Sequence, residues 1–265
     1  MTRWIALLAL CSALAVSPSA LARQETGFLD RAVTLHGVEY RYTVYVPRDF
    51  DPARRWPVIL ALHGGGETGV DGILPTVGAL AKAIRLHPER FPAIVIFPQA
   101  HEDGSPVWQR PNGEAALVEL DRALAEFQGD RSRVYLTGYS AGGNGSWYLA
   151  WRNPERFAAA LIVCGWVTSF HGPHNHRDYP SIPPASAADP YAEVARRVAP
   201  MPIWLVHGDA DKTVPVEQSR NMYAALKATH ADAHLTELPA VDHASWDGAY
   251  QDPDIAAWLF SQRRR

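Results

Sequence analysis

The sequence predicts a single α/β domain with a mostly parallel central sheet and helices on both faces. Short apolar runs, typical of strands that are covered on both faces, recur along the chain. Amphipathic helical patterns lie between these runs, and neither a long linker nor an internal repeat divides the chain. The apolar runs that predict parallel strands span residues 57–62, 93–97, 133–137, 158–164 and 202–206.

The remaining elements follow from periodicity. Residues 38–46 (VEYRYTVYV) alternate between apolar and polar side chains, which predicts a half-buried, antiparallel strand. Residues 114–127 place leucines at spacings of three and four with charges opposite, as an amphipathic helix requires. Further helices are expected at 144–151, 216–229 and 254–262. The segment 168–186 is rich in Pro and His and has no periodicity, so we expect a long loop of the kind that forms lids or binding elements.

The N-terminal residues have the pattern of a targeting segment. Arg3 precedes an apolar run at 4–16, and Ala20-Leu21-Ala22 has the small residues of a cleavage site. The run is shorter than the ~20 residues of a membrane-spanning helix. We therefore expect a cleaved signal peptide at 1–22, a single catalytic domain at 23–265, no membrane span, and a secreted or periplasmic protein.

Composition excludes several other classes of protein. The 25 Lys and Arg nearly balance the 28 Asp and Glu, for a net charge of −3, so no nucleic-acid partner is expected. The 2 cysteines cannot build a disulfide scaffold. Cys11 would leave with the signal peptide, and Leu10 before it disfavours lipidation. Cys164 would then remain alone, as a small core residue within an apolar run.

The pentapeptide Gly138-Tyr139-Ser140-Ala141-Gly142 carries the strongest signal of catalysis. It follows a predicted strand and precedes a predicted helix, which is the context of a nucleophile elbow. A direct strand-to-helix turn strains the serine backbone, and glycines on either side remove Cβ atoms that would clash. A tight turn with an incidental serine is the alternative. The pattern predicts Ser140 as a nucleophile.

A nucleophilic serine needs a histidine base and a carboxylate that orients it. In elbow-type hydrolases, the acid and then the histidine follow the serine in the chain. Asp211, in the loop after the strand at 202–206, is the predicted acid, with Asp209 as its rival. His243, in the loop between the last strand and the last helix, is the predicted base. The alternatives, His230 and His234, are expected to have surface or packing roles.

The run His63-Gly64-Gly65-Gly66 follows the strand at 57–62 and predicts an oxyanion hole. The backbone N–H of Gly65, or alternatively of Gly66, would act with that of Ala141, the residue after the nucleophile. Neither a P-loop lysine nor a dinucleotide-binding glycine pattern accompanies the run, so we expect no cofactor.

Together these motifs resemble the α/β-hydrolase superfamily. The resemblance rests on HGGG at 63–66, GYSAGG at 138–143, HGDADKTVP at 207–215 and DHASW at 242–246, and extends over about residues 35–262. The most similar branch contains secreted esterases and peptidases, including polyhydroxybutyrate depolymerases, feruloyl esterases and phospholipase/carboxylesterase-like proteins. It implies the α/β-hydrolase fold and the triad Ser140, Asp211 and His243. The sequence departs from this branch in the loop 168–186, so the resemblance implies less about substrate preference than about the fold and the triad.

Tryptophans and histidines outside the triad have competing interpretations. Trp108, Trp166 and Trp246 follow strand ends or the predicted base, so they are candidates for an apolar substrate site, with core packing as the alternative. Trp147, Trp151, Trp204 and Trp258 are predicted to be core residues, while Trp56 has no predicted role. His171, His174 and His176 have ligand-like spacing, but a solvated loop is favoured and no metal is predicted.

The sequence therefore predicts a secreted serine hydrolase that cleaves carboxylic esters through an acyl-enzyme. Small-molecule and polymeric esters are both candidate substrates, and the sequence leaves the acyl group and the oligomeric state open. Peptide hydrolysis with the same triad is the first alternative. A non-catalytic binding protein on the same fold is the second, although every triad member is present.

Overall fold

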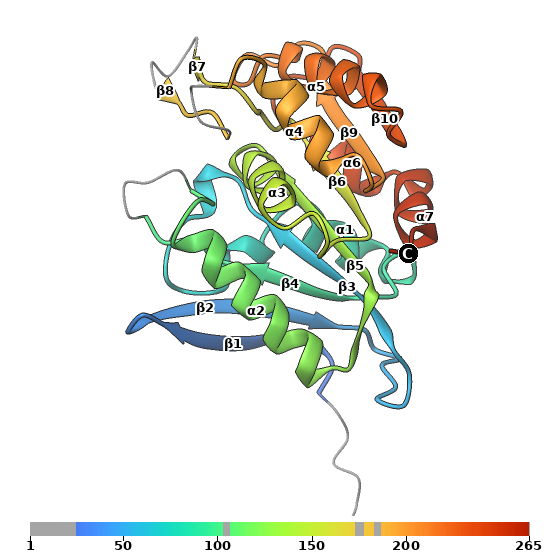
Figure 1. Ribbon diagram of the computed structural model, residues 1–265. Helices are drawn as coiled ribbons and strands as arrows, with labels where there is room; N and C mark the ends of the chain where they lie inside the picture. The colour runs from blue at the N-terminus through green and yellow to red at the C-terminus, as the bar shows by residue number, and fades with distance from the viewer. Residues whose placement is uncertain (1–24, 103–106, 173–177, 183–186, 265) are drawn as a thin grey trace, which may run out of the picture.

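The computed structural model describes residues 25–102, 107–172, 178–182 and 187–264 (Figure 1). Within them, an 8-stranded sheet has the order β1-β2-β4-β3-β5-β6-β9-β10. The strands from β4 to β10 in that order are parallel, while β1 and β2 are antiparallel at one edge. The strands of this sheet are β1 (Gly27–Leu35), β2 (Val38–Val46), β3 (Trp56–Leu62), β4 (Ile94–Pro98), β5 (Gly129–Tyr139), β6 (Ala159–Val163), β9 (Ile203–Gly208) and β10 (Ala233–Leu238).

Two hydrophobic cores lie on opposite faces of the sheet. Successive side chains of a strand point to opposite faces, and β3 shows this alternation: Val58, Leu60 and Leu62 belong to one core, Ile59 and Ala61 to the other. Helices α2 to α5 contribute to the first core, and α1, α6 and α7 to the second (Figure 1). The predicted fold class is confirmed. The helices are α1 (Ala79–Leu86), α2 (Asn112–Glu126), α3 (Ala141–Arg152), α4 (Pro190–Val198), α5 (Glu217–Ala228), α6 (Trp246–Gln251) and α7 (Pro253–Ser261).

Several elements, including α6, were not predicted from the sequence. Strand β1 pairs with β2 at the sheet edge and is mostly half-buried, and its sequence GFLDRAVTL does not alternate strictly between apolar and polar residues. Helix α1 was not anticipated. Helix α4 does have a start signal, because Asp189 accepts a hydrogen bond from the N–H of Ala192 and Pro190 is the first helical residue. The segment 168–186 contains a short hairpin, β7 (Phe170–His171) and β8 (Asp178–Tyr179).

Several sequence predictions concern single residues or the N-terminus. Cys164 is fully buried, as predicted. Among the predicted core tryptophans, Trp147 is buried, whereas Trp151, Trp204 and Trp258 are only half-buried and pack against the edges of the two cores. The predicted signal peptide at 1–22 lies outside the described residues. No helix in the described part of the chain is long and apolar enough to cross a membrane.

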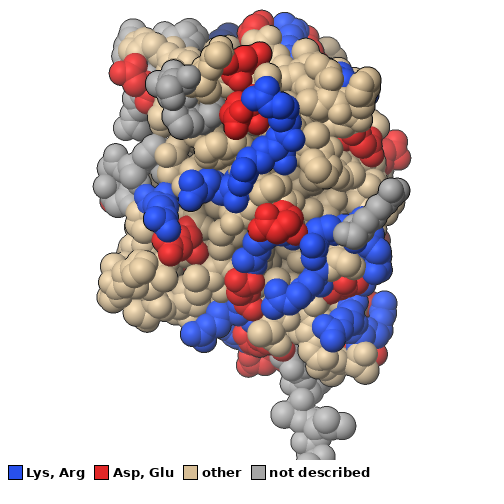
Figure 2. Space-filling view, in the orientation of Figure 1, with Lys and Arg blue, Asp and Glu red and all other residues tan. Residues whose placement is uncertain are grey.

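The surface mixes charges of both signs. Figure 2 shows Lys and Arg interspersed with Asp and Glu on the face that α2 crosses. Two ion pairs tie α2 to its surroundings there: Arg31 lies 2.7 Å from Glu126, and Arg156 donates to both carboxylate oxygens of Asp121. Partly exposed pairs of this kind add little to stability.

Candidate active site

The turn between β5 and α3 holds Ser140 in a strained conformation. Its φ is 54° and its ψ is −119°, a combination that L-residues rarely adopt. Only glycine fits two residues before and two residues after the serine. A Cβ on Gly138 would lie 2.3 Å from the carbonyl oxygen of Gly142, and one on Gly142 would lie 2.1 Å from that of Leu62. Close packing therefore forces the sharp turn, and Ser140 stays partly exposed at the N-terminus of α3.

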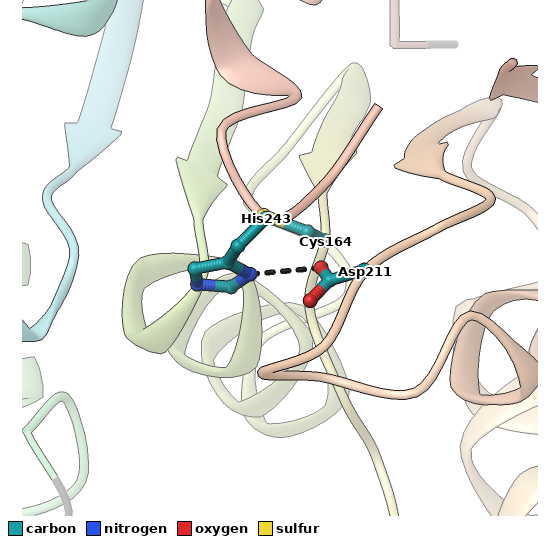
Figure 3. Close-up of side chains that lie close together, drawn as sticks. All are labelled: Cys164, Asp211 and His243. Atoms are coloured by element: carbon teal, nitrogen blue, oxygen red, sulfur yellow. Dashed lines mark hydrogen bonds and ion pairs between the residues drawn. The ribbon is translucent and has the colours of Figure 1, made fainter. Parts of the chain in front are cut away.

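His243 lies in the loop between β10 and α6 and reaches Ser140. Its Nε2 is 2.9 Å from the Ser140 Oγ, and its Nδ1 is 2.8 Å from the Asp211 Oδ2 (Figure 3). A carboxylate can only accept, so Nδ1 carries a proton and Nε2 of the neutral ring is left to accept from the serine. The structure thus brings together the predicted nucleophile, base and acid.

Asp211 follows β9, and its side chain is fully buried. Its Oδ1 accepts hydrogen bonds from the N–H groups of Thr213 and Val214, at 2.8 and 2.9 Å. Burial alone would raise the pKa of the Asp211 carboxyl, but hydrogen bonds from His207 and His243 offset this effect and hold the pKa below its ordinary value. The carboxylate therefore stays ionised beside His243.

The rival acid, Asp209, has a different role. It is exposed, and its carboxylate accepts a hydrogen bond from the N–H of Ala240 at 2.7 Å. This contact joins the loop after β9 to the turn after β10. Asp209 therefore shapes the turn, whereas Asp211 contacts the histidine. The alternative bases His230 and His234 are both exposed, and His234 stacks on Trp204.

Sequence reasoning missed His207, which is also part of this site. The side chain has 0% exposure, and its Nε2 lies 3.1 Å from the Asp211 Oδ2 and 3.1 Å from the Val214 carbonyl oxygen. Its Nδ1 lies 2.7 Å from the Ser219 Oγ on α5. The available signal was the His-Gly dipeptide just before the acid, at the end of a buried strand.

Gly65 is the glycine of the 63–66 run that adjoins the residue after the nucleophile. A Cβ built on Gly65 would lie 4.0 Å from the Cβ of Ala141, whereas one on Gly66 would have nothing within 4 Å. Ala141 is the first residue of α3, so its N–H has no acceptor within the helix. This geometry favours Gly65 over Gly66 as the partner of Ala141.

Hydrogen bonds made by buried groups hold the 63–66 loop in place. The His63 Nδ1 donates to the Gly64 carbonyl oxygen at 2.5 Å, and its Nε2 accepts from the N–H of Ala100 at 3.0 Å. Burial lowers the pKa of His63 to about 4, so the ring is neutral and one tautomer satisfies both contacts. The Trp108 Nε1 donates to the His63 carbonyl oxygen at 2.9 Å.

Trp108 therefore corrects one sequence expectation. Its side chain is only 1% exposed, packed between the loop and α3, and cannot line a substrate site. Trp166 is also buried, at 4% exposure, and its Nε1 donates to the Pro180 carbonyl oxygen. Of the predicted substrate tryptophans, only Trp246 is half-exposed, with its ring centroid 5.5 Å from that of His243.

An aromatic cluster that was not predicted lies beside the same site. Phe170 and Tyr179 of the β7–β8 hairpin stack at 4.6 Å, and Trp166 meets both rings edge-on. The cluster packs with Ala141 and Val214, which are neighbours of the nucleophile and the acid. Because Phe170 and Tyr179 remain partly exposed, the hairpin presents an aromatic surface next to the reacting groups.

One group of potential metal ligands lies within the site. Among the described residues, Cys164, Asp211 and His243 place one ligand atom each within 4.8 Å of one another (Figure 3). Burial raises the pKa of the Cys164 thiol to about 12, so this sulfur is a poor metal ligand, and the other two groups bond each other. In the predicted histidine loop, His171 pairs with Asp178 at 2.9 Å. His174 and His176 lie outside the described residues.

A sequence model of the prolyl oligopeptidase family matches residues 117–261, which include Ser140, Asp211 and His243. The chain belongs to the prolyl oligopeptidase family. It is 25% identical over 212 residues to an uncharacterized secreted protein of Arthroderma benhamiae, covering 73% of this chain and 22% of that protein. It is 30% identical over 136 residues to a protein of Aspergillus niger named "Probable feruloyl esterase C", covering 48% of this chain and 47% of that one. The chain thus spans less than half the length of either relative.

Solved structures extend the family assignment. The crystal structure of a thermostable esterase is similar to this prolyl oligopeptidase family member with a TM-score of 0.74 and 28% identity, over 89% of this chain and 63% of that one. The chain therefore has the α/β-hydrolase fold that its motifs predicted, within a superfamily of serine hydrolases.

Proposed function

We propose that this protein is a serine hydrolase that cleaves carboxylic esters. The observation that carries the proposal is the continuous chain of hydrogen bonds from the Ser140 Oγ to His243, at 2.9 Å, and from His243 to Asp211, at 2.8 Å. A serine hydroxyl becomes a nucleophile when a histidine can accept its proton and a buried carboxylate orients that histidine. Ser219, His207 and Asp211 form a second chain of such groups, but Ser219 and His207 are buried, at 4% and 0% exposure, whereas Ser140 is partly exposed to a substrate.

In the proposed mechanism, the Ser140 Oγ attacks the ester carbonyl carbon while the His243 Nε2 takes the serine proton. The N–H groups of Gly65 and Ala141 stabilise the negative oxygen of the tetrahedral intermediate. His243 then gives its proton to the leaving alcohol, and an acyl-enzyme remains on Ser140. Water, deprotonated by His243, attacks this ester and releases the acid. Asp211 stays ionised and stabilises the imidazolium, and no cofactor takes part.

Several observations support an exported esterase. A relative named as a feruloyl esterase and a similar esterase structure favour ester substrates, small or polymeric. The aromatic surface of Phe170 and Tyr179 fits an acyl or alcohol group with an apolar ring. The apolar N-terminal segment 1–22 and a relative named as secreted favour export of a mature domain at 23–265.

Peptide hydrolysis by the same triad is the second candidate function, because the matching family is named after a peptidase. Amides need protonation of a poorer leaving group than alcohols do, so the two activities separate in direct assays. Purified protein assayed on p-nitrophenyl acetate and on a proline-containing peptide p-nitroanilide decides between them. We expect ester turnover to exceed peptide turnover by at least about a thousandfold, roughly 4 kcal/mol in barrier. Faster peptide cleavage would replace the proposal.

Ser140→Ala tests the nucleophile. We expect hydrolysis of p-nitrophenyl acetate to fall by roughly 10³- to 10⁶-fold, because no covalent intermediate can form. Labelling by a fluorophosphonate should disappear in parallel. Ser261→Ala, which changes an exposed serine at the end of α7, should leave both unchanged. Wild-type protein that hydrolyses nothing and takes no label would favour the non-catalytic binding protein.

A further inference from the structure

Asp211 has more hydrogen-bond donors than orienting His243 requires. Its Oδ2 receives His243 at 2.8 Å and, from the other side, the His207 Nε2 at 3.1 Å. Both imidazoles share a single carboxylate oxygen. The Asp211 and His207 side chains are both fully buried, so the contact between them is shielded from solvent.

The contacts of His207 determine where its proton lies. The Nε2 faces the Asp211 carboxylate and the Val214 carbonyl, both at 3.1 Å, and both of these groups can only accept. Nε2 must therefore donate. In the neutral ring Nδ1 then accepts, and its partner at 2.7 Å is the Ser219 hydroxyl, which can donate. Ser219 on α5 thus fixes the tautomer that His207 needs.

We infer that His207 is a positioning residue of the hydrolytic site, which holds Asp211 in place and withdraws part of its charge from His243, with Ser219 locking the His207 tautomer. This role rests on the proposed function of the triad. The N–H groups of Thr213 and Val214 hold Oδ1, so without His207 the donor to Oδ2 among the described residues would be His243, the ring that Asp211 has to orient. His207 supplies a second, buried donor to Oδ2 and so leaves the carboxylate one orientation toward His243.

Few other ionisable groups face this network. Cys164 at the end of β6 lies close to the carboxylate, and Glu237 on β10 is near enough to interact with His207. On the outer side, Lys212 and Asp242 form an ion pair at 3.5 Å. The variants described below leave these groups unchanged, so a shift in pH dependence reports on the histidine contact.

His207→Phe tests the role, because it keeps a planar ring of similar size and removes both nitrogens. We expect kcat for p-nitrophenyl acetate to fall roughly 10- to 100-fold with little change in KM. We also expect the acidic limb of the pH–rate profile to move to higher pH, because Asp211 then stabilises the protonated His243 ring more strongly. A ring with a purely structural role would not move the limb.

Graded and matched variants accompany this change. His207→Gln retains an N–H donor near the Nε2 position and should recover kcat to within roughly tenfold of wild type. Ser219→Ala should reduce kcat by only about 3- to 10-fold, since it frees the tautomer without removing the donor. His234→Gln, on the exposed side of β10, should alter neither kcat nor the limb. An unmoved limb in His207→Phe, or no recovery in His207→Gln, would overturn the inference.

NMR of the ¹⁵N-histidine-labelled protein gives a readout that does not depend on activity. Long-range ¹H–¹⁵N correlations should show the His207 proton on Nε2, and Ser219→Ala should perturb that resonance. A His207 proton on Nδ1 alone would overturn the inference even in an active enzyme. If wild type hydrolyses no ester, the proposed function fails, while the titration of His243 in wild type and His207→Phe still decides the role of His207.

Discussion

His63 and His207 occupy equivalent places on two parallel strands but have partners of different kinds. Each precedes a glycine at the carboxyl end of a buried strand, β3 or β9, with exposures of 2% and 0%. His63 bonds only backbone groups, the Gly64 carbonyl and the Ala100 N–H. His207 bonds two side chains, those of Asp211 and Ser219, in addition to the Val214 carbonyl.

The difference shows how the same dipeptide can serve two parts of one site. The first histidine fixes a stretch of backbone, so that the N–H of Gly65 is held beside Ala141. The second fixes a carboxylate, which must keep both its charge and its direction. A backbone anchor needs a neutral ring, whereas an anchor for a carboxylate needs a donor at one nitrogen. Variants at the contacts of His207 should therefore change mainly catalysis, whereas variants at His63 and its contacts should change mainly stability.

The largest expected effect concerns Asp211, the partner of His207, because catalysis depends on the charge of its carboxylate. Asp211→Asn should reduce kcat on p-nitrophenyl acetate by roughly 10³- to 10⁴-fold, because the amide neither stabilises the imidazolium nor enforces the tautomer of His243. The fold should persist by circular dichroism. Asp209→Asn is the matched control, and its kcat should stay within about threefold of wild type. If Asp209→Asn were the more damaged enzyme, the assignment of the acid would be wrong.

The next effect is on stability and comes from the His63 side. Burial lowers the pKa of His63 to about 4, below the ordinary 6.5, so the unfolded state binds more protons between these values. The buried neutral His63 ring therefore makes the free energy of unfolding depend on pH: stability is highest above pH 6.5 and falls as the pH is lowered to 4. The fall amounts to about 3 kcal/mol in the free energy of unfolding.

Urea unfolding at pH 7 and pH 4 measures this loss. Titratable groups elsewhere contribute to both wild type and His63→Gln, so the difference between the two proteins isolates His63. We expect the variant to be less stable at pH 7 and to lose about 3 kcal/mol less than wild type on acidification. Parallel pH profiles for the two proteins would show that His63 is not buried as a neutral ring.

The smallest effect concerns the tryptophan beneath the His63 loop. Trp108→Phe leaves the buried His63 carbonyl without its donor and should lower the free energy of unfolding by about 1–2 kcal/mol, with a several-fold loss in kcat. Trp204→Phe is the control. Its Nε1 donates to the Thr236 hydroxyl at 3.0 Å, but the side chain is half-exposed, so water can replace the bond. Equal losses in the two variants would contradict the anchoring role of Trp108.

Local motifs were readable in the sequence because short-range sterics determine them. The alternation in residues 38–46 and the apolar run at 57–62 predicted β2 and β3. The edge strand β1 was not predicted, because its sequence places two apolar residues, Phe28 and Leu29, and then two charged ones, Asp30 and Arg31, side by side and so breaks the alternation. Trp108 was misjudged because its position after a strand end indicates nearness to the site but not whether the ring faces inward or outward.

By itself, the sequence determined the fold class, the parallel strands at the centre of the sheet, the glycine-flanked turn at Ser140 and the resemblance to the α/β-hydrolase superfamily. The close approach at Gly138 is local, because a Cβ there would meet the Gly142 carbonyl within the same turn, whereas the one at Gly142 depends on the neighbouring strand, because a Cβ there would meet the Leu62 carbonyl at the end of β3. Only the tertiary structure decided which polar groups meet. Ser140 and His243 are 103 residues apart in the chain, and their contact depends on parallel strands that end at one sheet edge. The hydrogen bond between His207 and Asp211 likewise depends on the path of the loop after β9, which no spacing rule gives.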